Sequence, residues 1–169
     1  MRRRSKQSGQ ATVEYAITFV AIMAPLMFAI IFTAELLWVW HSIVDFTRDG
    51  ASYAATHCYE AGGGNVQSYM QSHVPLMVDI DQFRGGQATI VVNYFSVDST
   101  SGQLTAFACS GGECSTDCVP DAVTVTISNY QFSHFMSYLK LPPVQLPDFR
   151  TSLAIQSAGC DPEQGTCLP

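Results

Sequence analysis

The sequence predicts an α+β protein in which a long N-terminal helix, apolar at first and then amphipathic, packs on a small antiparallel sheet domain. Three features support this prediction. They are an uncharged apolar stretch near the N-terminus, a helical periodicity that continues beyond it, and several stretches rich in Val, Ile and Thr in the second half. The chain has 169 residues, which is room for one domain and a terminal element.

The composition excludes two classes of protein. Apolar residues make up 47% of the chain and charged residues 13%, whereas disordered chains show the opposite balance. Half of the eight basic residues lie in the first six positions, and no basic stripe follows them. A nucleic-acid-binding protein needs such a stripe, so no nucleic-acid contact is predicted.

Residues 1–9 form a basic leader, and the segment after it predicts a membrane span. Tyr15 to Ala34 contains no charged residue and has Pro25 near its middle, where a kink is expected. Twenty helical residues rise roughly 30 Å, the thickness of the hydrocarbon layer of a bilayer, although a buried core helix is the alternative. The basic leader predicts a single pass through the inner membrane, with a cytoplasmic N-terminus and a periplasmic C-terminal domain.

The helix is expected to extend beyond the span, over about residues 10–60. Apolar or small residues recur every three or four positions and trace one helical face. This stripe consists of Leu36, Val39, Trp40, Ile43, Thr47, Ala51, Ala54 and Cys58. Because its side chains shrink toward Ala, another element is expected to pack closely on the later turns. Gly50 is a candidate break, and Gly62, Gly63 and Gly64 are expected to end the helix.

Residues 65–169 predict a small antiparallel sheet domain. Its strand-like stretches are rich in β-branched residues and partly alternate between apolar and polar side chains. They are Gln87–Val97, Leu104–Cys109, Ala122–Phe132 and Thr151–Gln156. The polar stretch Val97–Gln103 predicts a hairpin turn between the first two strands, and Asn65–His73 predicts a short helix.

All six cysteines follow the apolar stretch, which predicts disulfides in an oxidising compartment. They are Cys58, Cys109, Cys114, Cys118, Cys160 and Cys167. We expect Cys160 to pair with Cys167, and two of the three cysteines at 109, 114 and 118 to pair locally, which leaves the third for Cys58. A zinc site is the alternative, but it fits poorly because the spacings are irregular and no histidine is nearby. No metal is therefore predicted.

The first turns of the helix carry the most specific signal. Gly9 follows the basic leader and suits a protease subsite, because glycine has no side chain and is easily extended. Glu14 stands where the apolar helix begins, and an unpaired carboxylate is costly there. Cleavage after Gly9 would create an α-amino group at Gln10, about one helical turn from Glu14. That group could pair with Glu14 of its own or a neighbouring chain. The alternative is that Glu14 simply marks the water boundary.

These residues resemble a known family. GQATVEY, residues 9–15, resembles the processing motif of type IV pilins of the Flp/Tad (tight adherence) class, and the chain is similar to TadE-type pseudopilins, or minor pilins. RDGASYAA, at 48–55, and the stretch 123–146 extend the resemblance. It implies a type IV pilin-like fold and cleavage between Gly9 and Gln10 by a prepilin peptidase. It also implies that Glu14 and Tyr15 take part in assembly.

The resemblance further implies partners and a location. The partners would be the major and minor pilins of the same system, the inner-membrane assembly platform and the lipid of the inner membrane. The assembled protein would lie in an extracellular pilus that serves surface adhesion, biofilm growth or DNA uptake. The cysteine-rich segments 109–118 and 160–167 are not features of this resemblance.

Two other classes of function fit the sequence less well. An enzyme is disfavoured because the sequence has no GxSxG, HExxH or P-loop pattern, and no cofactor is expected. The remaining alternative is a single-pass anchored periplasmic binding module that is neither processed nor polymerised.

Overall fold

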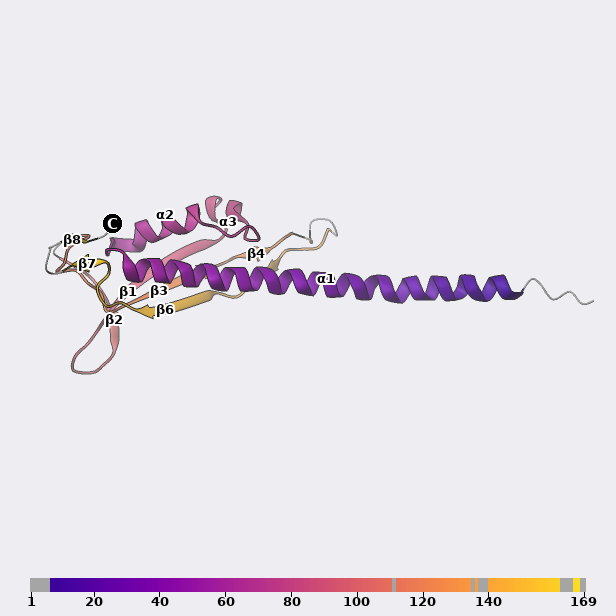
Figure 1. Ribbon diagram of the computed structural model, residues 1–169, viewed down its shortest axis with the longest axis horizontal. Coiled ribbons are helices and arrows are strands. Elements are labelled where there is room, and N and C mark those ends of the chain that lie inside the picture. Colours follow the sequence, from indigo (N-terminus) through magenta and orange to yellow (C-terminus); the bar gives the residue numbers. More distant parts are fainter. Residues whose placement is uncertain (1–6, 111, 135, 137–139, 162–165, 168–169) are drawn as a thin grey trace, which may run out of the picture. The chain divides into compact units, whose positions relative to one another are not determined.

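The computed structural model describes residues 7–110, 112–134, 136, 140–161 and 166–167. The chain forms two compact units, Met1–Trp38 and Val39–Pro169, which are called unit 1 and unit 2 below. Helix α1 (Gln7–Thr56) contributes residues to both units, and a small antiparallel sheet follows it in unit 2 (Figure 1). The predicted α+β, pilin-like fold is confirmed.

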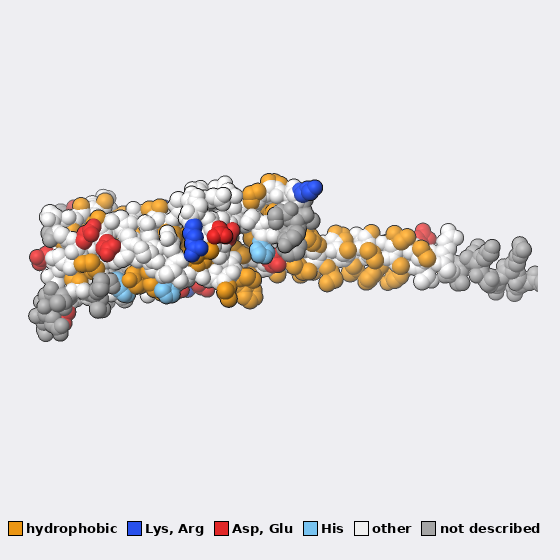
Figure 2. All heavy atoms as spheres, turned by 90° about the horizontal axis from the view of Figure 1, so that it is seen from above, with side chains coloured by type: hydrophobic (Ala, Val, Ile, Leu, Met, Phe, Trp, Pro, Cys, Tyr) orange, Lys and Arg blue, Asp and Glu red, His pale blue; other side chains and the backbone are white. Residues whose placement is uncertain are grey.

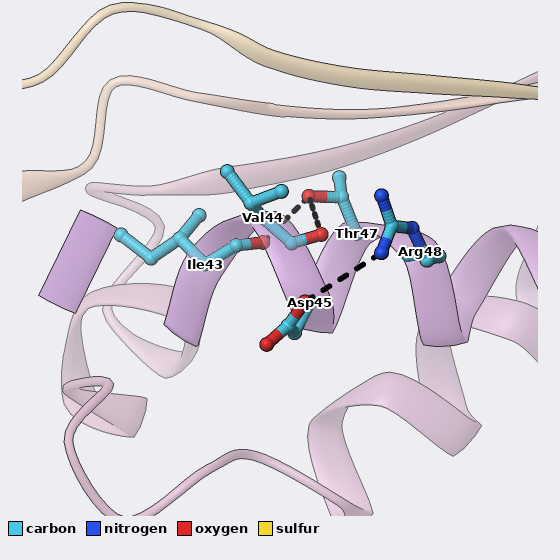
Figure 3. A network of polar contacts seen from close by, with 5 residues as sticks. All are labelled: Ile43, Val44, Asp45, Thr47 and Arg48. Carbon is cyan, nitrogen blue, oxygen red and sulfur yellow. Dashed lines mark hydrogen bonds and ion pairs between the residues drawn. The ribbon is translucent and has the colours of Figure 1, made fainter. Parts of the chain in front are cut away.

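The part of α1 that follows Val39 buries most of the predicted stripe, although Trp40 is 39% exposed. Ile43, Thr47, Ala51 and Ala54 are almost completely buried. The Thr47 hydroxyl donates to the carbonyl oxygens of Ile43 and Val44, which satisfies this buried polar group within the helix (Figure 3). On the exposed side of the same turn, Arg48 Nη1 lies 3.9 Å from Asp45 Oδ1. An exposed pair at this spacing stabilises a helix only slightly.

The expectation of a helix break at Gly50 is wrong, because α1 continues through it to Thr56. The side chain of Met70, on helix α2 (Gly64–Ser72), occupies the space that a Cβ at Gly50 would fill. The glycine therefore serves the close approach of two helices, and this packing outweighs its low helix propensity.

The C-terminus of α1 also differs from the expectation. The helix ends at Thr56, four residues before the expected end, and is followed by the 3-10 helix η1 (Ala61–Gly63). Gly62 and Gly63 have φ values of 77° and 66°, a conformation that glycine adopts at little cost. The glycines thus form the connection to α2 rather than the last turn of α1.

The sheet has four strands in the order β2-β1-β3-β6, all antiparallel (Figure 1). The strands are β1 (Thr89–Val97), β2 (Leu104–Ala106), β3 (Ala122–Ser128) and β6 (Phe149–Ala154). One face of the sheet supplies core side chains, among them Val92, Tyr94, Val123, Val125 and Ile127. Because side chains alternate along a strand, the other face carries residues such as Asn93, Thr124 and Ser152.

Each predicted strand has a counterpart, with shifted bounds. The predicted strand Ala122–Phe132 is divided into β3 and β4 (Gln131–Phe132), because Asn129 has a φ of 62° and turns the chain. The predicted turn joins β1 and β2, where Val97 is opposite Leu104. Two smaller pairs complete the domain, β4 with β5 (Val144–Gln145) and β7 (Cys160–Asp161) with β8 (Thr166–Cys167).

Short helix α3 (Ile80–Arg84) closes one side of the core. The Asp79 carboxylate accepts a hydrogen bond from the Asp81 backbone N–H at 3.0 Å and thereby caps the helix. The ring of Phe83 meets that of Phe46 on α1 edge-to-face, with 5.9 Å between the ring centroids. This contact places α3 beside the first turns of α1 in unit 2.

Candidate processing and assembly segment

Gly9 and Gln10 lie on the exposed first turns of α1. A Cβ built at Gly9 would meet no atom within 4 Å, and its backbone is helical rather than left-handed. Neither packing nor backbone conformation therefore requires a glycine at this position.

Glu14 and Tyr15 occupy the next turn, and both are exposed. The Tyr15 ring stacks on that of Phe19, with 6.1 Å between centroids, and the Glu14 carbonyl oxygen accepts a hydrogen bond of 2.8 Å from the Thr18 hydroxyl. The Glu14 carboxylate has no ion-pair partner within the described part of the chain.

The apolar stretch from Tyr15 to Ala34 is helical throughout, and α1 continues through Pro25 without interruption. Its large side chains are exposed, including Ile17 at 65% and Ile30 at 60% (Figure 2). By its length and composition, α1 could span a membrane. A helix that is apolar all round is stable only against lipid or other apolar helices.

Three disulfides lie in unit 2. They join Cys58 to Cys114, Cys109 to Cys118 and Cys160 to Cys167. The last pair is the one expected near the C-terminus, and the other two agree with one local pair and one link to Cys58. The Cys58–Cys114 bond holds the loop after β2 against the end of α1. The cysteines thus form covalent links within unit 2.

Residues 9–52 match the model of the family described as TadE-like protein. This segment is TadE-like. The match begins at Gly9 and includes Glu14, the apolar stretch and the first turns of α1 in unit 2. No curated protein and no solved structure matches the chain.

The TadE-like match covers the part of α1 up to Ser52, and the antiparallel sheet of unit 2 lies outside it. Among the described residues, no group of three or more His, Cys, Asp or Glu side chains could hold a metal ion. The Asp79 carboxylate accepts a hydrogen bond from the Asp81 backbone N–H and so caps α3.

Sequence reasoning missed a column of four stacked rings on unit 2. His57 stacks on Tyr53, Tyr53 on Tyr69 and Tyr69 on His73, with centroid distances of 3.6, 4.0 and 4.4 Å. Each histidine Nδ1 lies within 3.0 Å of the carbonyl oxygen of the tyrosine four residues before it. The signal was present as a repeated pattern, YAATH and YMQSH, at the C-terminal ends of α1 and α2. The column joins the two helices.

Proposed function

We propose that this protein is a minor pilin, or pseudopilin, of a Tad-type pilus. A prepilin peptidase would remove residues 1–9 by cleavage between Gly9 and Gln10. The mature chain would then leave the inner membrane for the pilus, with help from the assembly platform and the other pilins. The observation that carries the proposal is the TadE-like match, which begins at Gly9 and covers a helix whose apolar surface is exposed.

Transfer from the bilayer to a fibre is physically reasonable for such a helix. Before assembly, lipid would cover its apolar side chains, with the N-terminus in the cytoplasm and unit 2 in the periplasm. In the fibre, neighbouring apolar helices would cover the same side chains, so one apolar environment replaces another. The pilus would serve surface adhesion, biofilm growth or DNA uptake.

Glu14 needs a counter-charge in both environments, because an unpaired carboxylate is costly at the edge of an apolar layer. Processing would supply one, since the new α-amino group of Gln10 carries a positive charge. In the fibre, this group on one subunit would pair with the free carboxylate of Glu14 on its neighbour. Removal of the leader and assembly are thereby linked through a single ion pair.

The first experiment tests processing through a Gly9→Phe variant. We expect it to stay at its full mass in cells, whereas the wild-type chain begins at Gln10. A Cβ at Gly9 meets no atom within 4 Å, so we expect the change to leave the packing of α1 undisturbed. Gly9→Ala adds only a methyl group and serves as the control for the size of the side chain. Wild-type protein that still begins with Met1 would instead indicate an unprocessed, anchored binding module.

The second experiment tests the ion pair through a Glu14→Ala variant. We expect this variant to be processed and extracted with the membrane fraction like the wild type, but to be depleted from sheared pili. Glu14→Asp keeps the charge and should retain more incorporation than Glu14→Ala. Equal amounts of wild-type and Glu14→Ala protein in purified pili would contradict the role of the carboxylate.

A further inference from the structure

A small cavity opens on unit 2 between α3 and β4. Its volume is about 180 Å³, below the roughly 300–1,000 Å³ of pockets that take drug-sized ligands. A cavity of this size has room for a single small ring. Its polar lining comes from α3, β4 and the residues next to them, namely Asp79, Gln82, Gln87, Gln131 and Ser133.

The buried side chain of Gln82 holds the polar part of this cavity together. Its amide donates to the Gln131 carbonyl oxygen at 2.7 Å and accepts from the Gln131 backbone N–H at 2.9 Å, which joins α3 to β4 (Figure 1). The same amide donates to the Asp79 carboxylate at 3.2 Å, and the Asp79 backbone N–H donates to the Tyr130 hydroxyl at 2.8 Å. The cavity is thus formed before any ligand binds, and this preorganisation lowers the cost of binding.

Three polar side chains of the lining have no partner within the described part of the chain. They are the amides of Gln87 and Gln131 and the hydroxyl of Ser133. Each amide offers two N–H donors and an acceptor oxygen, and the hydroxyl both donates and accepts. Water satisfies these groups when no ligand is bound. A ligand that displaces this water must therefore bring donors and acceptors of its own.

The lining disfavours three other classes of ligand. No Lys or Arg is among the described lining residues, and the Asp79 carboxylate would repel a phosphate or carboxylate group. Both Asp79 carboxylate oxygens already accept hydrogen bonds, and the described residues contain no cluster that could hold a metal ion. A peptide strand pairs through free backbone groups. Here the N–H and carbonyl oxygen of Gln131 are both bonded to Gln82, so β4 offers a strand no pairing at this residue.

We propose that this cavity binds one neutral sugar ring, an uncharged hexose unit of a polysaccharide. The hydroxyl groups of a hexose donate and accept hydrogen bonds, which matches the free amides of Gln87 and Gln131. Its C–H groups match the apolar part of the lining, which consists of Met136, Leu141 and Pro143. The inference goes beyond the proposed function, because it concerns unit 2 alone and holds whether or not the chain enters a pilus.

Side-chain NMR of the full chain in lipid nanodiscs tests the inference, since detergents with sugar headgroups would compete for the cavity. The probes are the methyl glycosides of glucose, galactose, mannose and N-acetylglucosamine, each titrated to high millimolar concentration. We expect at least one of them to shift the Met136 methyl signal and the Gln82 side-chain amide signal in a saturable way. The methyl signal of Met70, which is completely buried beside Gly50, should not move.

A double variant tests the two free amides. Gln87→Ala combined with Gln131→Ala should weaken binding of the sugar by about tenfold or more, because each lost hydrogen bond lowers the affinity several-fold. Neither side chain is bonded within the described part of the chain, and an unchanged Met70 signal verifies the fold. The matched control is Gln103→Ala, which removes an exposed amide from the turn between β1 and β2 and should bind like the wild type.

Three results would overturn the inference. The first is the absence of any shift of the Met136 and Gln82 signals with all four glycosides. The second is equal binding by the wild type and the double variant. The third is a stronger response of the same signals to inorganic phosphate or to N-acetylglycinamide, which would assign the cavity to an anion or a peptide. None of these results depends on processing at Gly9 or on Glu14, so the proposed function is tested separately.

Discussion

At the scale of single residues, two buried tyrosines of unit 2 differ in whether the hydroxyl has a partner. The Tyr130 hydroxyl accepts a hydrogen bond from the Asp79 backbone N–H. The Tyr94 hydroxyl is buried on β1 and has no hydrogen-bond partner among the described residues. Burial, with a smaller contribution from Glu60, raises the pKa of Tyr94 to about 12, and burial also raises the pKa of Tyr130.

This difference predicts opposite effects of two matched substitutions. Tyr94→Phe removes an unpaired buried hydroxyl and should leave the free energy of unfolding unchanged or raise it by about 1 kcal/mol. Tyr130→Phe leaves the Asp79 N–H without its acceptor and should lower the free energy of unfolding by about 1 kcal/mol. Denaturant unfolding of the detergent-solubilised chain at pH 7 measures both values. A larger loss for Tyr94→Phe than for Tyr130→Phe would show that the Tyr94 hydroxyl has a partner.

The same tyrosines give a pH dependence whose sign follows from the raised pKa. Between the ordinary value of 10.0 and about 12, the unfolded chain has lost the Tyr94 proton while the folded chain retains it. The stability contributed by Tyr94 is therefore complete below pH 10 and lost as the pH rises to about 12. Unfolding of Tyr94→Phe should show a shallower decline over this interval, with the contribution of Tyr130 remaining.

The polar turn after β1 is a residue-scale feature that the sequence could predict. The Asp98 carboxylate accepts hydrogen bonds from the backbone N–H groups of Thr100 and Ser101, and these bonds lower its pKa. Such a turn depends on a few neighbouring residues, so its sequence alone identifies it. The unpaired hydroxyl of Tyr94 depends on residues far along the chain and could not be foreseen.

At the scale of elements, α1 and α2 approach each other at Gly50. A Cβ at this position would lie 2.9 Å from Met70 Cε, and Met70 is completely buried. Alanine would improve helix propensity by about 1 kcal/mol, but it would force Met70 out of a filled core. Local propensity and tertiary packing therefore act in opposite directions at one residue.

We expect packing to prevail, so that Gly50→Ala lowers the free energy of unfolding by about 1–3 kcal/mol. The background variant Met70→Ala empties the space, and in it Gly50→Ala should be neutral or stabilising. A double-mutant cycle by denaturant unfolding gives the coupling between the two positions. If Gly50→Ala lowers the free energy of unfolding by the same amount in the wild-type and Met70→Ala backgrounds, the contact with Met70 is not the cause of the loss.

The helix and the strands differed in how well their bounds could be predicted. The periodicity of α1 identified the buried positions Ile43, Thr47, Ala51 and Ala54, because a helical face repeats within the element itself. The split of the strand Ala122–Phe132 at Asn129 was missed, since a left-handed residue inside a β-rich stretch has only a weak local signal. The helix end at Thr56 was also missed. There, the Cα of Gly159 lies so close to the Thr56 carbonyl that a side chain would not fit.

At the scale of the whole molecule, the disulfides of unit 2 close chain loops of very different length. Cys58 and Cys114 are 56 residues apart, and Cys160 and Cys167 are 7 apart. A cross-link restricts the unfolded chain more when the loop that it closes is longer. The Cys58–Cys114 bond also links the helical and cysteine-rich segments of the domain.

Removing each bond in turn should reflect this difference. Cys58→Ala with Cys114→Ala is expected to lower the free energy of unfolding by ~4 kcal/mol, and Cys160→Ala with Cys167→Ala by ~2.5 kcal/mol. Denaturant titrations under oxidising conditions provide the measurement, and wild-type protein treated with reductant is the reference. A greater loss for the C-terminal pair would show that native contacts, rather than loop closure, dominate.

The sequence by itself determined the features whose physical cause lies within a short stretch of chain. These are the apolar stretch from Tyr15 to Ala34, the helical stripe that follows it, the strand-like segments and the Gly9–Glu14 motif. Their basis is local, since hydropathy, periodicity and residue chemistry are properties of neighbouring residues. The local C-terminal disulfide pair could be anticipated for the same reason.

Only the tertiary structure decided which distant residues meet. It paired Cys58 with Cys114, placed Met70 on Gly50 and stacked Tyr53 on Tyr69. Such contacts join segments that are far apart in the sequence. Many sequences with the same local pattern could form different long-range contacts. Close packing of the core selects one arrangement, because each buried side chain must fill the space that its neighbours leave.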